Sequence, residues 1–216
     1  MSWRLICLAC CSTMGLFPDR AVPADDAVRY RVVAGESELA VLVFRAGALG
    51  RFAHNHVISS NGITGTVLVG DTPADSSLDL TLNVDSLEVD DPEARADAGS
   101  VFEGTVDEKD IEGTRGNMLS DKLLDADRYK EIRIVSSGIS GEFSDMTVDA
   151  QITIKGEQHN VELPVNAIVY GDRIVATGRT DISHSELGLS PFTAGFGTLS
   201  VAEDMTFRYR IVAVRE

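Results

Sequence analysis

The sequence predicts a mainly β protein, built as a single antiparallel barrel of about eight strands with a helical insertion at about residues 91–125. Most of the chain alternates apolar and polar residues in short runs that end at glycine-rich turns, which is typical of half-buried strands. Only the stretch from Asp90 to Lys130 loses this alternation. A barrel is favoured over a two-sheet sandwich, the alternative architecture, because closing a sheet removes its exposed edges.

The longest predicted hairpin covers Thr147 to Tyr170. Every second residue is apolar from Val148 to Ile154 and again from Val161 to Val169. Lys155-Gly156-Glu157-Gln158 predicts the turn between them, because glycine adopts the positive φ that tight turns require. Each strand has one apolar face, and two such strands are not stable in water by themselves. The rest of the chain must therefore cover this face.

Further strands are predicted on both sides of the helical region. The run from Leu39 to Phe44 contains no polar residue, which predicts a strand covered on both faces, and a polar break at Gly35–Glu38 precedes it. The remaining predicted strands are Tyr30–Val33, Ile63–Val69, Leu78–Val84, Glu131–Ile139, Ile174–His184 and Met205–Ala213.

Two helices and a short third one are predicted within the insertion. Asp91-Pro92 is a good helix start, with aspartate as the cap and proline at the first helical position, and Gly99 is a stop. A second helix is predicted over Asp107–Leu119, where acidic residues in the first turn fit the helix dipole. Ser120 is expected to cap the third helix, which runs through Leu124.

Residues 1–24 are predicted to be a signal peptide and residues 25–216 to be the folded domain. An apolar run, Leu5–Phe17, follows Arg4 and precedes the small residues Val22-Pro23-Ala24, and it is too short to span a bilayer. All three cysteines lie in this leader, so the domain is expected to contain no disulfide. A secreted chain without disulfides fits a periplasm-like compartment.

The formal net charge of −15 argues against binding partners that are themselves negatively charged. Nucleic acid is excluded because no concentrated basic patch is visible, and anionic membrane surfaces are expected to repel the chain. The acidity is interpreted as a source of solubility.

No nucleophile elbow, phosphate-binding loop, dinucleotide fingerprint or zinc-protease motif occurs in the sequence. The acidic pair Asp90 and Asp91 is interpreted as helix caps and solvated loop. We therefore expect neither catalysis nor a cofactor.

Three segments carry a family resemblance: Met118–Asp125 with Tyr129 and Ile132, Ile152–Gly156 with Val161 and Leu163-Pro164-Val165, and Ser183–Pro191. On these residues the chain resembles the YceI-like family, periplasmic proteins with a lipocalin-like barrel that bind polyisoprenoid or other long-chain amphiphiles. The resemblance spans nearly the whole of residues 25–216 and implies the same fold, compartment and ligand class. The chain departs from the family at Lys130-Glu131, where proline is common, in its long insertion, and at His54-Asn55-His56, which is not a family signature.

A barrel of about eight strands either fills with its own side chains or holds one slender ligand. The inward residues are predicted to be small and apolar, and Gly178, Ala150 and Ala176 are expected to leave room. Burial is worth about 0.8 kcal/mol per methylene, so a long alkyl or isoprenoid chain needs no strong polar contact. A packed core made of the same residues is the alternative.

The residues expected to contact such a ligand are aromatic, aliphatic and histidine side chains near the barrel mouth: Phe44, Phe52, His54, His56, Met118, Leu123, Ile134, His184, Phe192 and Phe196. For His54 and His56 three interpretations stay open. The first is a polar gate that hydrogen-bonds a quinone oxygen or a lipid head group. The second is a zinc or copper site. The third is a structural role, in which each imidazole bonds to backbone groups.

The sequence thus predicts a non-catalytic periplasmic carrier that sequesters an isoprenoid-type lipid or a quinone in an apolar barrel. The alternatives are a metal-binding module that uses His54 and His56, and a stress-response or assembly protein with a filled barrel. A carrier of this kind is expected to make transient contact with a membrane, and a homodimer is compatible with the sequence.

Overall fold

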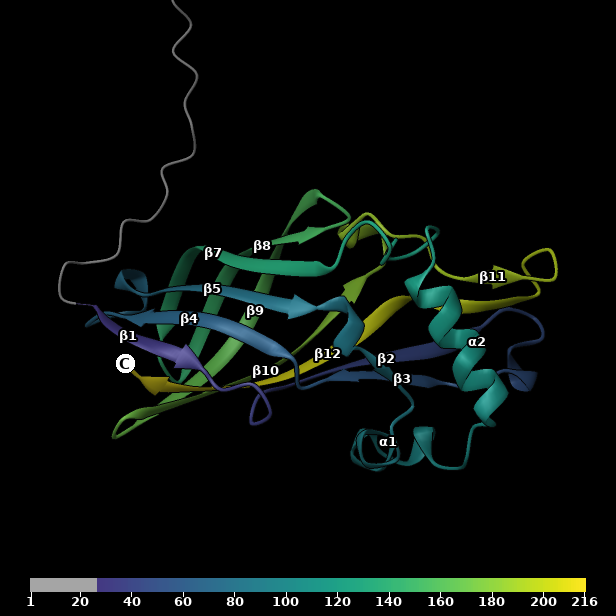
Figure 1. Ribbon diagram of the computed structural model, residues 1–216, viewed down its shortest axis with the longest axis horizontal. Coiled ribbons are helices and arrows are strands. Elements are labelled where there is room, and N and C mark those ends of the chain that lie inside the picture. The colour runs from purple at the N-terminus through teal and green to yellow at the C-terminus, as the bar shows by residue number, and fades with distance from the viewer. Residues whose placement is uncertain (1–26) are drawn as a thin grey trace, which may run out of the picture.

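The computed structural model describes residues 27–216, so the predicted signal peptide lies outside the described residues. These residues form one antiparallel sheet that closes on itself (Figure 1). The strands are β1 Val28–Val32, β2 Glu38–Ala46, β3 His56–Ser60, β4 Ile63–Val69, β5 Ser77–Asn83, β6 Glu88–Val89, β7 Glu131–Glu142, β8 Asp145–Ile154, β9 Glu157–Tyr170, β10 Arg173–Ser183, β11 Thr193–Ala194 and β12 Leu199–Arg215. The α-helices are α1 Pro92–Ala98 and α2 Glu108–Leu119, and the 3-10 helices are η1 Gly50–Phe52, η2 Pro73–Asp75, η3 Val84–Ser86, η4 Ser100–Phe102 and η5 Ser185–Leu187.

The barrel is closed by the first and last strands. β1 pairs with β4 on one side and with the end of β12 on the other, where Tyr30 lies opposite Arg215 and Val32 opposite Ala213. Three wall strands consist of two segments each, β1 with β2, β3 with β4, and β5 with β6, so the barrel has eight strands. The predicted barrel is therefore confirmed, and a two-sheet sandwich is excluded.

The predicted hairpin is confirmed as β8 and β9. Nine residue pairs join these strands, from Met146 opposite Val165 to Ile154 opposite Glu157. Lys155 and Gly156 form the turn with positive φ values of 51° and 78°. The predicted apolar face is buried, since Val148 and Ala150 are each only 1% exposed.

The apolar run in β2 is covered on both faces, as predicted. Val41 belongs to the core inside the barrel, whereas Ala40 and Leu42 pack outside it with Ala94 of α1 and Phe102 of η4. The first part of the helical insertion therefore covers the outer face of β2 and β3, as Figure 1 shows for α1.

Two of the three predicted helices are confirmed. The carboxylate of Asp91 accepts hydrogen bonds from the first turn of α1, which ends at Gly99, and α2 begins after Asp107. The prediction of a third helix over Ser120–Leu124 is wrong, because the chain turns back there toward β7. Asp125, with φ 47°, donates its N–H to the carbonyl of Ser120 in this turn. No helix within residues 27–216 is long and apolar enough to cross a membrane.

Candidate ligand-binding site

The barrel encloses a cavity of about 980 Å³. This volume lies at the upper end of the range of about 300–1,000 Å³ that is usual for ligand pockets. On β12 the lining extends from Leu199 to Ala213. Leu199, Ser200 and Val201 face the cavity before a bulge, and every second residue faces it from Met205 onward. At about 3.3 Å per residue, this lining follows the strand for roughly 45 Å. The interior is a cavity along most of the barrel and not a filled core.

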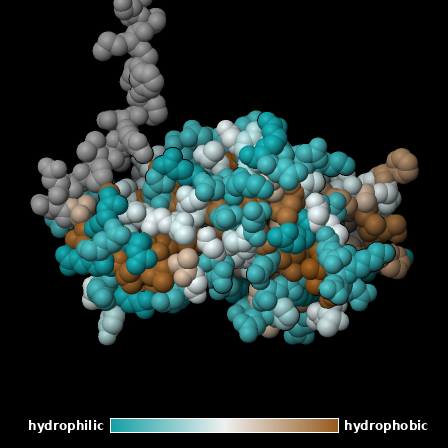
Figure 2. Space-filling view, viewed as in Figure 1, coloured by the Kyte–Doolittle hydropathy of each residue, from teal (hydrophilic) through white to brown (hydrophobic). Residues whose placement is uncertain are grey.

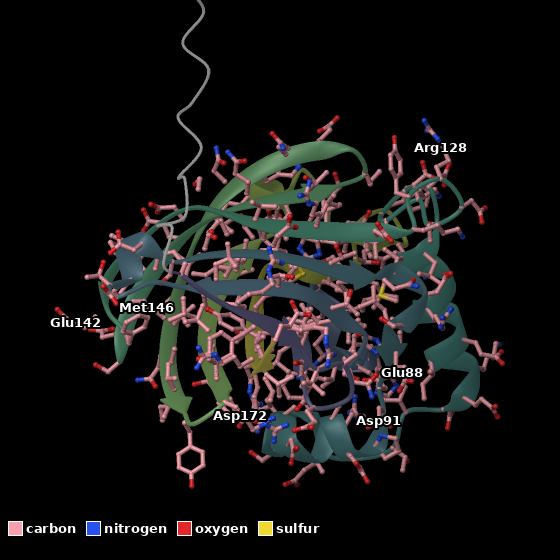
Figure 3. The ribbon with its side chains drawn as sticks, turned by 60° about the vertical axis from the view of Figure 1, so that its left-hand side comes forward. Glu88, Asp91, Arg128, Glu142, Met146 and Asp172 are labelled. Atoms are coloured by element: carbon pink, nitrogen blue, oxygen red, sulfur yellow. The ribbon has the colours of Figure 1, made fainter. Side chains whose placement is uncertain are left out.

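Polar groups of the cavity wall gather at one end. α2 lies at this end, which we call the mouth (Figure 1), and the polar lining residues there are His54, His56, Lys109, Asp110, Thr114, Asn117, Ser120, Lys122, His184, Ser190, Thr193 and Ser200. The opposite end, where Figure 3 labels Glu142 and Met146, is lined by apolar residues such as Phe143 and Val169. Ser76 is the polar exception there, and its hydroxyl donates to the carbonyl of Thr72 at 2.9 Å. The cavity therefore combines a polar mouth with apolar depth.

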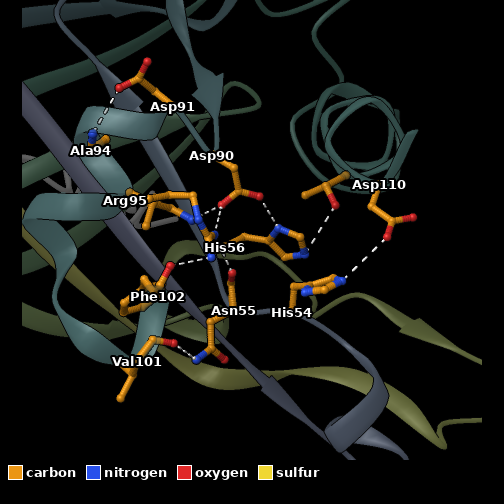
Figure 4. Close-up of polar contacts among 12 residues, drawn as sticks. His54, Asn55, His56, Asp90, Asp91, Ala94, Arg95, Val101, Phe102 and Asp110 are labelled. Atoms are coloured by element: carbon orange, nitrogen blue, oxygen red, sulfur yellow. Dashed lines mark hydrogen bonds and ion pairs between the residues drawn. The ribbon is translucent and has the colours of Figure 1, made fainter. Parts of the chain in front are cut away.

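A buried carboxylate positions His56 at the mouth (Figure 4). The side chain of Asp90 is 0% exposed and accepts a hydrogen bond from His56 Nδ1 at 2.6 Å. It also accepts from the backbone N–H of Val57 at 2.9 Å and from Arg95 Nη1 at 2.5 Å. The interpretation of Asp90 as part of a solvated loop or cap is therefore wrong. Its backbone adopts φ 57° between β6 and α1, and its carboxylate lies buried beside the guanidinium of Arg95.

Arg95 extends this network to the backbone around it. It donates to the carbonyl oxygens of Asn55 at 2.9 Å and Phe102 at 2.6 Å. Asn55 in turn donates to the carbonyl of Val101 at 3.0 Å. These bonds tie α1 and η4 to the start of β3, so the helical insertion is part of the folded barrel.

The network keeps Asp90 ionised. Burial alone would raise the pKa of the Asp90 carboxyl, but hydrogen bonds from His56, Val57 and Arg95 and the charge of His56 outweigh burial and leave this pKa below its usual value. His56 Nδ1 therefore donates to a carboxylate, and Nε2 is the atom that faces α2, 3.5 Å from Thr114 Oγ1.

His54 makes a second contact between the mouth and α2. Its Nε2 lies 3.7 Å from a carboxylate oxygen of Asp110, and its ring centroid lies 6.4 Å from that of His56. Within residues 27–216 no group of three or more His, Cys, Asp or Glu side chains is arranged to hold a metal ion. The metal-binding alternative for these histidines therefore has no ligand set in the part of the chain that the structure describes.

His184 is the third imidazole of the cavity wall. It is 3% exposed, and its Nδ1 donates to the carbonyl oxygen of Glu203 at 2.8 Å, which leaves Nε2 for another partner. His159 packs nearby, where a Cβ added at Gly188 would lie 2.5 Å from its ring. All four histidines of the sequence therefore lie near the mouth.

The wall is incomplete between β9 and β10, where a side chain replaces the missing backbone pairing. The two strands pair only from Arg173 opposite Tyr170 to Thr177 opposite Asn166. Just beyond, the ring of Tyr209 covers Gly178, and its hydroxyl donates to the carbonyl of Pro164 at 2.6 Å. Burial raises the pKa of this hydroxyl. The room that Gly178 was expected to leave is therefore filled by Tyr209.

Eight of the ten residues predicted to contact a ligand line the cavity: Phe52, His54, His56, Met118, Leu123, Ile134, His184 and Phe192. Phe44 does not, because Val43 takes the inward position and directs Phe44 outward, where its ring centroid lies 5.5 Å from that of Phe102. Phe196 does not either, since it is fully exposed in the turn between β11 and β12.

Sequence reasoning placed Met118 at the mouth but missed the polar residues that α2 contributes there. Asp110, Thr114 and Asn117 all line the cavity, and their spacing of four and three residues places them on one face of a helix. That spacing is a signal that the sequence contains. It also missed Tyr209, although Tyr209 continues the apolar phase of Met205 and Phe207.

A model of the YceI-like domain matches residues 30–213. The chain belongs to the YceI-like family. None of the curated proteins compared is similar enough in sequence to count as a relative.

Solved structures share the YceI-like fold. Burkholderia cenocepacia BcnA has a TM-score of 0.61 at 17% identity, covering 84% of this chain and 98% of its own. A polyisoprenoid-binding domain from Saccharophagus degradans has a TM-score of 0.55 at 14% identity, covering 88% and 99%. The YceI protein of Campylobacter jejuni has a TM-score of 0.53 at 11% identity, covering 74% and 84%. At these identities the similarity establishes the fold alone.

Proposed function

We propose that this YceI-like protein binds a long-chain amphiphile, an isoprenoid-type lipid or a quinone, in its barrel and carries it without covalent change. The observation that carries the proposal is the distribution of polarity in the cavity, which is apolar along its depth and polar at the mouth. An amphiphile has the same division. Its chain gains about 0.8 kcal/mol for each methylene that leaves water, while its head group keeps polar partners.

The mouth offers both hydrogen-bond acceptors and donors to such a head group. Nε2 of His184, when its ring is neutral, accepts from a hydroxyl, and the Thr114 hydroxyl and the Lys109 ammonium donate to a carbonyl oxygen. The Asp90 carboxylate is buried behind His56 and is already bonded to three donors. The site is therefore better suited to hold a head group than to transfer protons to it.

The family supports the ligand class, since one of the similar structures is a polyisoprenoid-binding domain. The predicted signal peptide supports a periplasmic location, where a carrier would exchange its ligand through transient contact with a membrane.

Blocking the cavity tests this function. Native mass spectrometry of purified protein, before and after addition of a polyprenol or a quinone, is expected to detect one bound ligand. Ala176→Phe places a large ring in the cavity, and we expect it to weaken binding at least tenfold, as the milder Ala167→Leu does to a smaller extent. Thr177→Phe is the matched control, because Thr177 is exposed on the same strand and does not line the cavity.

Two results would contradict the proposal. One is a folded Ala176→Phe protein that binds the ligand as tightly as the wild type. The other is a wild-type protein that neither co-purifies with a lipid nor binds added polyprenols or quinones. Circular dichroism and thermal unfolding of each variant establish that it is folded.

A further inference from the structure

Two loops at the mouth present apolar side chains to solvent. The η1 loop, residues 47–55, exposes Leu49 and Phe52, and the η5–β12 loop, residues 188–198, exposes Phe192 and Phe196. The exposed fractions range from 40% at Leu49 to complete exposure at Phe196. Figure 2 shows hydrophobic surface projecting at the end of the molecule where Figure 1 places β11. An exposed apolar group of this kind costs solubility, so it indicates contact with another surface.

The two loops are fixed to one another. The N–H of Leu49 donates to the carbonyl of Thr198 at 2.9 Å, and Gly47 approaches the same carbonyl so closely that a Cβ there would lie 2.6 Å from it. Phe196 has φ 56°, a left-handed conformation that phenylalanine rarely adopts, and it stands between two glycines that also have positive φ. The turn therefore holds an aromatic ring outward at the cost of backbone strain.

The loops also lack the negative charge of the rest of the chain. The sequence has 34 Asp and Glu in 216 residues, about one in six, so the 20 residues of the two loops would carry about three if charge were evenly spread. They carry none, and the η1 loop contains Arg51. The nearest acidic residues lie beside the loops, since Asp110 of α2 is 3.7 Å from His54 and Glu186 and Glu203 flank the η5–β12 loop. The two loops themselves therefore add no negative charge that would repel an anionic membrane.

The exposed apolar surface continues into the cavity, because Phe52 and Phe192 are exposed and also line it. We propose that the η1 loop and the η5–β12 loop insert Leu49, Phe52, Phe192 and Phe196 into the interface of a lipid bilayer, so that the cavity mouth opens onto the membrane. This inference rests on the proposed function, because a lipid-like ligand is the reason for a mouth to meet a bilayer. Aromatic and leucine side chains are the residues that peripheral proteins bury at the boundary between head groups and acyl chains.

Leu49→Ser/Phe196→Ser tests the surface without touching the cavity, because neither residue lines it. Binding is measured by co-sedimentation with phosphatidylcholine vesicles at about 0.15 M salt, where the charges of the distant parts of the chain are screened. We expect the wild type to sediment with the vesicles and the double variant to partition at least tenfold more weakly, given the apolar area that both side chains bury. Ile168→Ser/Tyr170→Ser is the matched control, because both residues are exposed at the opposite end of the barrel and do not line the cavity. It is expected to bind like the wild type.

Ligand uptake separates this inference from the proposed function. Polyprenol supplied in detergent should load the wild type and the Leu49→Ser/Phe196→Ser variant equally, whereas polyprenol supplied in vesicles should load the variant at least tenfold more slowly. Failure of every protein to load from detergent would contradict the proposed function and leave the vesicle result to stand on its own.

Three results would overturn the membrane inference. The first is equal vesicle binding by the wild type and the Leu49→Ser/Phe196→Ser variant. The second is loss of binding in the control variant alone. The third is a wild-type dimer in solution that this variant converts to a monomer, with no vesicle binding by either, since the loops would then contact a second copy of the chain.

Discussion

The two sides of the cavity mouth each carry a phenylalanine, which is buried on one side and fully exposed on the other. On the side of the helical insertion, Phe102 is 1% exposed beneath α1, and the loop that contains it is held by the network of Asp90 and Arg95. On the other side, Phe196 is fully exposed in a turn whose hydrogen bonds reach only neighbouring residues and the adjacent loop. A buried polar network makes the first side part of the fold. The second side adds little to folding, and its apolar residues are free to contact something else.

The two sides should differ most in how much unfolding free energy is lost when their phenylalanines are replaced by alanine. Phe102→Ala removes a buried ring and is expected to lower the free energy of unfolding by about 3–5 kcal/mol. Phe196→Ala removes an exposed ring, and its effect should stay within about 0.5 kcal/mol. Urea denaturation followed by circular dichroism measures both. Equal losses in the two variants would remove the distinction between the sides.

Removal of the buried charge should have the next largest effect. Asp90→Asn keeps a residue that tolerates positive φ but leaves Arg95 without its carboxylate, so we expect a loss of about 3 kcal/mol in unfolding free energy. Asp91→Asn is the control one residue away, because asparagine caps a helix as well as aspartate does, and its loss should be close to zero. A small loss in Asp90→Asn would mean that the network does not hold the helical insertion in place.

Acid should weaken the helical side selectively. The pKa of Asp90 is lower in the folded protein than its unfolded value of about 3.9, so this carboxylate contributes stability above about pH 4 that is lost as the pH falls through the folded pKa. Unfolding free energies between pH 7 and pH 3 should therefore fall more steeply below pH 4 in the wild type than in Asp90→Asn. The exposed carboxylates Glu186 and Glu203 also have lowered pKa values, but both proteins contain them and their contributions cancel in the difference.

The smallest expected effect belongs to the loop side. The guanidinium of Arg51 lies 4.7 Å from the ring centroid of Phe52, and an exposed contact of this type is worth about 0.5–1 kcal/mol at most. Arg51→Gln should change the unfolding free energy by about 0.5 kcal/mol or less. A loss above about 2 kcal/mol would show that this loop does support the fold.

Much of the architecture was predictable because it depends on local sequence signals. These are the alternation of apolar and polar residues and the residue types that begin or end a helix or strand. The alternation from Val148 to Ile154 and the Asp91-Pro92 start of α1 both led to the observed elements. The apolar run Leu39–Phe44 correctly indicated burial on both faces. In that same run the residues of both strand faces are apolar, so the pattern does not show which of them point into the barrel. For this reason Phe44 was wrongly assigned to the ligand site.

The buried network was not predictable in the same way. Asp90 lies 34 positions from His56 in the sequence, and only the fold brings the two side chains together. The sequence shows Asp90 beside a helix cap, where a solvated side chain is the usual outcome, and no local pattern distinguishes it from Asp91. The mouth histidines could be chosen by residue type, but their partners depend on contacts between distant segments.

The closure of the wall by Tyr209 has a consequence for how this sequence can change over time. A Cβ at position 178 would clash with both the backbone carbonyl oxygen of Pro164 and the Tyr209 ring, so a smaller residue at position 209 would remove only one of the two clashes. The Tyr209 hydroxyl donates to this same carbonyl of Pro164 on β9 and so holds it close to Gly178. We therefore expect close homologues to keep glycine at position 178, whereas position 209 can change without a matching change at position 178.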